Sequence, residues 1–128
     1  MEEKGYQQFA GEFIIGARLF SYNFGAILAR REQEIEEWLE SHPIIPVDKE
    51  NWDETMRNNQ NHTNLRLELE EIRAAKMRWE LGTYGICMED DCGIDIPEER
   101  LILIPHGKRC AKCQQKKEKS HPSKRRYW

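Results

Sequence analysis

Four cysteines are the residues of this chain whose type and spacing could support chemistry. Cys87, Cys92, Cys110 and Cys113 form the pattern C-x4-C-x17-C-x2-C, and no cysteine precedes them in the 128-residue sequence. Tetrahedral Zn²⁺ binds four soft donors of this kind, and two short cysteine pairs separated by a longer loop supply them. We therefore predict one structural zinc ion with these four thiolates as its ligands.

Other uses of the cysteines fit the sequence less well. A redox-active C-x2-C pair needs a βαβ context, which this chain lacks, and four unligated thiols on so polar a segment would be prone to reaction. A catalytic zinc site keeps a coordination position open for water or substrate, whereas four thiolates close it. We expect a protein that is not an enzyme.

The residues beside the cysteines suggest how such a site is built. Gly93 follows the second cysteine, where a zinc knuckle often needs a positive φ. The acidic residues 89–91 are expected to form a solvated loop, because four thiolates around Zn²⁺ carry a net charge of about −2 and repel carboxylates. Lys108, Arg109 and Lys112 lie near the second cysteine pair and are expected to offset that charge.

An apolar stripe with helical period precedes the cysteine-rich segment. Phe13, Phe20 and Ile27 recur every seven residues, which predicts one long amphipathic helix over roughly residues 8–41. The sequence "SHPIIPVD" ends this helix, because its two prolines lack backbone donors and push the preceding residues out of the α region.

A second stripe of the same period predicts a second helix. It begins at Asn51 or Asp53, which are both good N-caps, and ends at Gly82 as its C-terminal cap. The polar residues 57–64 are poor helix formers, so we expect this part of the helix to be frayed or bent. The apolar members of the stripe are Leu65, Leu69, Ile72, Ala75 and Trp79.

Together these patterns predict a mainly α protein. It consists of a long antiparallel two-helix, coiled-coil hairpin, a small four-cysteine zinc finger and a C-terminal helix. Phe20 and Trp79 are assigned to the seam between the two helices. The predicted segments are residues 1–82 for the hairpin, with its tip near 42–53, residues 83–115 for the finger, and residues 116–128 for a basic helix or tail.

Composition limits where the protein acts. The chain is 34% charged and 38% hydrophobic, and it contains no apolar run long enough for a membrane span. Its N-terminus lacks the basic region of a signal peptide, so we expect a cytoplasmic protein with no membrane partner. A reducing compartment disfavours structural disulfides, which supports the interpretation of the cysteines as metal ligands.

Charge is distributed unevenly along the chain. Residues 1–99 contain 10 Lys/Arg against 22 Asp/Glu, whereas residues 100–128 contain 10 against 1. A basic tail beside a zinc finger is typical of nucleic-acid binding. Phosphates would, however, repel an acidic hairpin that forms most of the molecule. Direct DNA binding is therefore the second interpretation, and a non-enzymatic adaptor that binds another protein is the third.

The sequences "GTYGIC" and "CGIDIPEERLILIPHGKRCAKCQ" resemble the C-terminal zinc finger of the DksA/TraR family, bacterial regulators that bind RNA polymerase. The resemblance covers residues 82–115. It implies a hairpin that enters the secondary channel of the polymerase and modulates transcription initiation. We expect the protein to be a monomer when free. The first cysteine pair contains two more residues than the family's Cys-x-x-Cys. Of the family's acidic tip motif, Asp-x-x-Asp-x-Ala, only one aspartate is matched, either Asp48 or Asp53.

Overall fold

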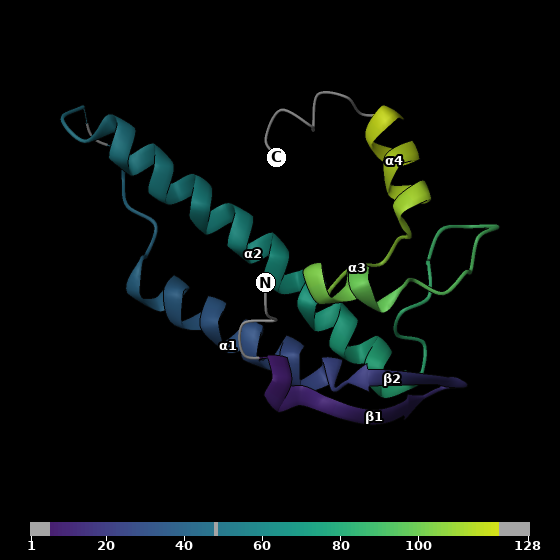
Figure 1. Ribbon diagram of the computed structural model, residues 1–128. Coiled ribbons are helices and arrows are strands. Elements are labelled where there is room, and N and C mark those ends of the chain that lie inside the picture. Colours follow the sequence, from purple (N-terminus) through teal and green to yellow (C-terminus); the bar gives the residue numbers. More distant parts are fainter. Residues whose placement is uncertain (1–5, 48, 121–128) are drawn as a thin grey trace.

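A computed structural model describes residues 6–47 and 49–120 of the chain. Two long helices, α1 (Phe24–Ser41) and α2 (Trp52–Leu81), form a hairpin, and most of the other elements lie at its base (Figure 1). Among the described residues, no helix has the length and apolar character needed to cross a membrane. The elements are η1 (Tyr6–Phe9), β1 (Ala10–Ile15), β2 (Arg18–Tyr22), α1 (Phe24–Ser41), α2 (Trp52–Leu81), α3 (Glu98–Leu103) and α4 (Ala111–Ser120).

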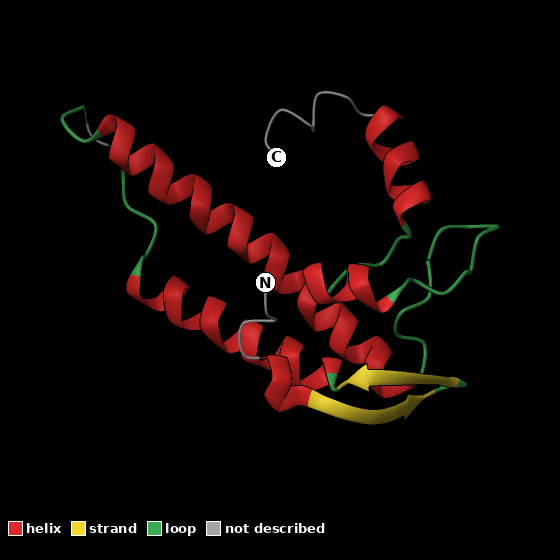
Figure 2. Cartoon of the chain, viewed as in Figure 1, coloured by secondary structure: helices red, strands yellow, loops and turns green. Residues whose placement is uncertain are grey.

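The first part of the predicted first helix is a β-hairpin (Figure 2). The prediction of one helix over residues 8–41 is therefore wrong for β1 and β2, which pair antiparallel around a two-residue turn. Gly16 begins this turn with φ 64°, the conformation that glycine supplies at the first central position of a type II′ turn. The seven-residue spacing was misleading because Phe13 and Phe20 are direct cross-strand partners.

The two helices follow their sequence signals closely. The side-chain oxygen of Asn23 accepts the backbone N–H of Ala26 at 3.0 Å and caps α1, which ends before the first proline of the turn. Helix α2 is continuous, so residues 57–64 are helical and the expected fraying is absent from this described segment. Gly82 closes α2 in the left-handed conformation, with φ 84°, as predicted.

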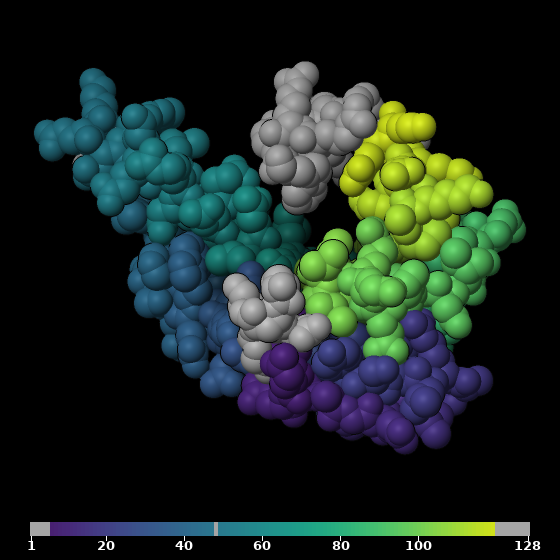
Figure 3. All heavy atoms as spheres, in the orientation of Figure 1, coloured from purple at the N-terminus to yellow at the C-terminus, as the bar shows by residue number. Residues whose placement is uncertain are grey.

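The hydrophobic core occupies only the base of the hairpin. Its last buried members toward the tip are Ile35 on α1 and Leu69 on α2, and the half-buried Leu39 and Leu65 pack against it. Between these two positions, Thr55 is the one buried residue that the structure describes. The distal half of the hairpin is thus a thin projection from a compact base (Figure 3).

An aromatic cluster fills the base, where the β-hairpin meets α2. Phe20 is fully buried, and its ring centroid lies 5.5 Å from that of Trp79 and 5.5 Å from that of Tyr84. The predicted contact between Phe20 and Trp79 is therefore present, although Phe20 reaches it from a strand and Trp79 is half-buried. The cluster joins the hairpin to the segment that leads into the finger.

Candidate zinc centre

The first cysteine pair lies on a tight turn held by backbone hydrogen bonds. The N–H of Cys87 donates to the carbonyl of Ile94 at 2.8 Å, and the N–H of Ile96 donates to the carbonyl of Gly85 at 2.7 Å. Between these bonds the chain reverses through Asp91 and Gly93, with φ of 66° and 69°. The positive φ predicted at Gly93 is confirmed. The two extra residues between the cysteines enlarge this turn without displacing either sulfur from the cluster.

The second cysteine pair lies at the start of α4. Cys110 immediately precedes the helix, and its carbonyl accepts the N–H of Gln114 at 2.9 Å. Cys113 lies in the first turn. The N-terminus of a helix carries a partial positive charge, which would complement the negative charge of thiolates bound to a metal ion.

The structure brings all four predicted ligands together. Their Sγ atoms lie within 4.8 Å of one another, and those of Cys92 and Cys110 are 3.9 Å apart. Four sulfurs at about 2.3 Å from a tetrahedral Zn²⁺ would be about 3.8 Å apart. Cys87 and Cys110 are buried and the other two are half-buried, so the donor set fits a closed zinc site.

The thiols differ in their tendency to ionise. Burial acts to raise the pKa of Cys87, but hydrogen bonds to the backbone of Cys110 and Glu89 and to neighbouring thiols outweigh it and lower the pKa to about 7. Burial and the other three thiols raise the pKa of Cys113 to about 12. A metal ion that binds all four sulfurs must therefore displace protons from this cluster.

One of the acidic residues near the cysteines has a specific partner. Glu89 forms an ion pair with Arg109, and this hydrogen bond lowers the pKa of the Glu89 carboxyl. The expectation of a purely solvated acidic loop is therefore wrong for Glu89, which links the two cysteine-bearing segments. Asp90 and Asp91 are exposed, as expected.

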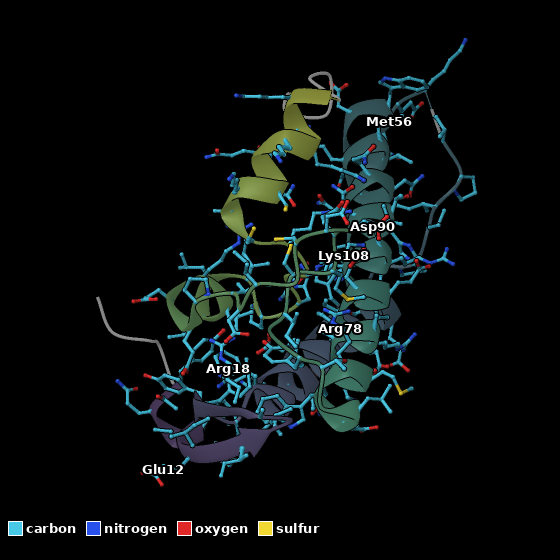
Figure 4. All side chains as sticks on the ribbon, turned by 90° about the vertical axis from the view of Figure 1, so that its right-hand side faces the viewer. Glu12, Arg18, Met56, Arg78, Asp90 and Lys108 are labelled. Carbon is cyan, nitrogen blue, oxygen red and sulfur yellow. The ribbon has the colours of Figure 1, made fainter. Side chains whose placement is uncertain are left out.

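Further contacts hold the finger against the hairpin, on the face shown in Figure 4. The ammonium of Lys108, expected beside the thiolates, lies 3.1 Å from the carboxylate of Glu71 on α2. Within the finger itself, the hydroxyl of the buried Tyr84 donates to the carbonyl of Pro105 at 2.6 Å, and burial raises the pKa of this tyrosine. Arg18 on β2 donates to the carbonyl of Gly85 at 3.0 Å.

Sequence reasoning missed these contacts, because their partners lie far apart in the chain. The one local signal was the aromatic residue before glycine in "TYGIC".

Of the two predicted tip carboxylates, Asp53 lies far from the four cysteines, at the other end of the hairpin. Asp48 lies outside the described residues. Asp53 is exposed in the first turn of α2, where a negative charge interacts favourably with the helix dipole. The structure thus brings the four cysteines together and places Asp53 apart from them (Figure 1).

Residues 82–119 match the family model of the prokaryotic dksA/traR C4-type zinc finger. The matched segment includes all four cysteines. An uncharacterized protein of Aquifex aeolicus (strain VF5) is 49% identical over 51 residues, which are 40% of this chain and 34% of that protein. The match thus spans about a third of the relative's length.

A solved structure has a fold similar to that of this chain. Transcription factor DksA2 from Pseudomonas aeruginosa superposes with a TM-score of 0.62 and 24% sequence identity, over 77% of this chain and 83% of that chain. The predicted fold class, a mainly helical hairpin protein with a four-cysteine finger, is confirmed.

Proposed function

We propose that this protein is a bacterial transcription regulator that binds RNA polymerase through its helical hairpin and holds one structural zinc ion. The combination of a DksA/TraR finger with a hairpin like that of transcription factor DksA2 is the observation that most supports this proposal. Four thiolates leave no coordination position for substrate, so the zinc would stabilise the fold and take no part in a reaction.

The shape of the hairpin suits insertion into a channel of the partner. Its last buried core residues are Ile35 and Leu69. Beyond them the hairpin consists of the end of α1 and the loop 42–51, which lie beside α2 (Figure 1). Cys87, Cys92, Cys110 and Cys113 would hold the zinc ion, and the ion would cross-link the two turns of the finger. The bond of Lys108 to Glu71 and that of Arg18 to Gly85 then connect the finger to α2 and to the β-hairpin.

The proposal is tested by binding to purified bacterial RNA polymerase. One variant replaces residues 38–66 with a short Gly–Ser linker, which spares the last buried core residues at the base. A second variant ends at residue 120 and lacks the basic tail. We expect the shortened hairpin to lose binding and the tail deletion to retain it, with zinc content and folding of both variants unchanged.

Direct nucleic-acid binding is the alternative that the basic C-terminal end favours. Affinity for DNA through lysines and arginines falls steeply as salt concentration rises. If the full-length chain binds DNA in this manner and the chain ending at residue 120 does not, the DNA interpretation replaces the polymerase proposal.

Asp48 and Asp53 are the proposed tip carboxylates. Asparagine has nearly the size of aspartate and lacks only its charge, so Asp48→Asn should change stability by less than about 0.5 kcal/mol and leave zinc content nearly unchanged. It should alter transcription in a purified assay at concentrations where the protein is bound to polymerase. Unchanged transcription with Asp48→Asn but altered transcription with Asp53→Asn would assign the role to Asp53.

A further inference from the structure

The tip of the hairpin displays a group of exposed apolar side chains. Its five members, here called the apolar tip, are Ile44, Ile45, Val47, Trp52 and Met56, with exposed fractions from 43% to 54%. Ile45 and Val47 line a hollow against the first turn of α2, and Met56 lies at the end of α2 farthest from the base (Figure 4). Single exposed apolar residues are ordinary, but a cluster of this kind marks a binding surface.

The loop that carries Ile44, Ile45 and Val47 is bound to α2 by hydrogen bonds. The amide of Asn59 donates to the carbonyl of Ile45 at 3.0 Å and accepts the N–H of Ile45 at 3.3 Å. The amide of Asn58 donates to the carbonyl of Pro43 at 3.1 Å. The loop covers Thr55, which is 3% exposed. These bonds hold the loop backbone in place while its apolar side chains stay in solvent, which lowers the entropy lost on binding.

The charge of the distal hairpin limits what the apolar tip can bind. Residues 36–57 contain seven Asp/Glu and two Lys/Arg. Anionic lipid headgroups and nucleic-acid phosphates would be repelled by this charge. A protein groove with an apolar floor and a border of Lys or Arg side chains complements both properties of the tip.

We propose that the apolar tip docks into an apolar, basic-bordered groove of RNA polymerase, and that these side chains anchor the hairpin there. This inference rests on the proposed function, because it names the chemistry of the contact that the hairpin makes. Burial of the apolar side chains anchors the tip, and its carboxylates complement the Lys and Arg side chains at the border of the groove.

The test measures affinity for purified bacterial RNA polymerase with variants of the apolar tip. Trp52→Ala combined with Met56→Ala should weaken binding at least about tenfold, as truncation of central interface anchors does. Ile44→Ser combined with Val47→Ser is a second, independent pair from the loop and should act in the same direction. Leu67→Ala is the matched control, because Leu67 is 57% exposed on the same helix but outside the apolar tip.

Folding and zinc content are measured for each variant, so that a loss of affinity is assigned to the surface. Binding to vesicles of phosphatidylglycerol is measured in parallel and is expected to be absent. Full affinity of both tip pairs, together with loss of binding in the shortened hairpin, would contradict this inference alone. A wild-type chain that does not bind polymerase would overturn the proposed function as well. Vesicle binding that depends on Trp52 and Met56 would replace the protein groove with a membrane.

Discussion

The ring of Trp79 occupies the space that a side chain at residue 25 would need. A Cβ atom built on Gly25 would lie 2.6 Å from the indole, so glycine lets α1 and α2 approach closely at the base of the hairpin. The indole then contacts Phe20 from the β-hairpin and Tyr84 from the finger, with ring centroids 5.5 Å and 5.3 Å away. Trp79 thus joins the β-hairpin and the start of α1 to the segment that leads into the finger.

Phe20→Ala should destabilise the protein by about 3–5 kcal/mol, because Phe20 is fully buried and its removal leaves a cavity among three aromatic rings. Denaturation by urea, followed by circular dichroism, measures this loss. The control is Leu19→Ala in the same strand, since Leu19 is 55% exposed and its truncation should cost much less. Equal losses for the two variants would contradict the assignment of Phe20 to the core.

Cys110→Ser should abolish stoichiometric zinc binding, because a hydroxyl is a poor replacement for a thiolate ligand. Zinc in the purified protein is quantified by atomic absorption under reducing conditions. Asp91→Asn is the control, since asparagine tolerates the left-handed backbone at this position and supplies no ligand. A folded wild-type protein without zinc would contradict the proposed metal site.

Elements differ in how far they could be predicted. The clustering of the four cysteines was predictable, because zinc chemistry depends on residue types and short spacings, which a sequence displays directly. The β-hairpin was not, because a seven-residue spacing of Phe13 and Phe20 fits both a helix face and a cross-strand pair. Gly11 and Gly16 were the contrary signal, since each disfavours a helix by about 1 kcal/mol.

The polar segment of α2 shows the same limit of prediction. Its asparagines lower helix propensity locally, and their partners lie 14 and 15 residues away in the tip loop. No local pattern reveals such partners. The segment is helical because the bonds to the loop and the neighbouring turns of the helix offset its weak propensity.

Asn59→Ala should loosen the tip loop while leaving the base intact. The substitution removes two hydrogen bonds to Ile45, each worth about 0.5–1.5 kcal/mol when fully formed and less when exposed. Hydrogen exchange measured by mass spectrometry should show faster exchange in residues 42–51 and unchanged exchange around Phe24. The matched control is Asn61→Ala, at an exposed position two residues along the same helix. Unchanged exchange in the loop of Asn59→Ala would show that these bonds do not hold it.

In the whole molecule, the finger and the hairpin share one hydrophobic core. Two of the cysteines, Cys87 and Cys110, belong to the same buried cluster as Ile35 and Leu69. Tyr84 adds a buried contact between the two parts. The base therefore forms one cooperative unit, although the family match covers only the finger.

Removal of zinc by a strong chelator should consequently lower the melting temperature of the helices as well as that of the finger. Metal bound to the folded state alone stabilises it by mass action, and the shared core transmits that stabilisation to α1 and α2. Thermal melts followed at 222 nm and by tryptophan fluorescence should shift together. A helical transition that is unaffected by the chelator would show that the hairpin folds independently of the metal.

The core ends halfway along the hairpin, and this sets which part of the protein can change in length. Seven residues added to each arm, beyond Ile35 and before Leu69, would extend the hairpin by about 10 Å. Thr55 is the one buried residue that the structure describes in this part, so only the packing around Thr55 would be affected. The length of the hairpin can thus change while the stability of the base stays the same. Over evolution, or in an engineered series, the same four-cysteine base can therefore carry hairpins of different length.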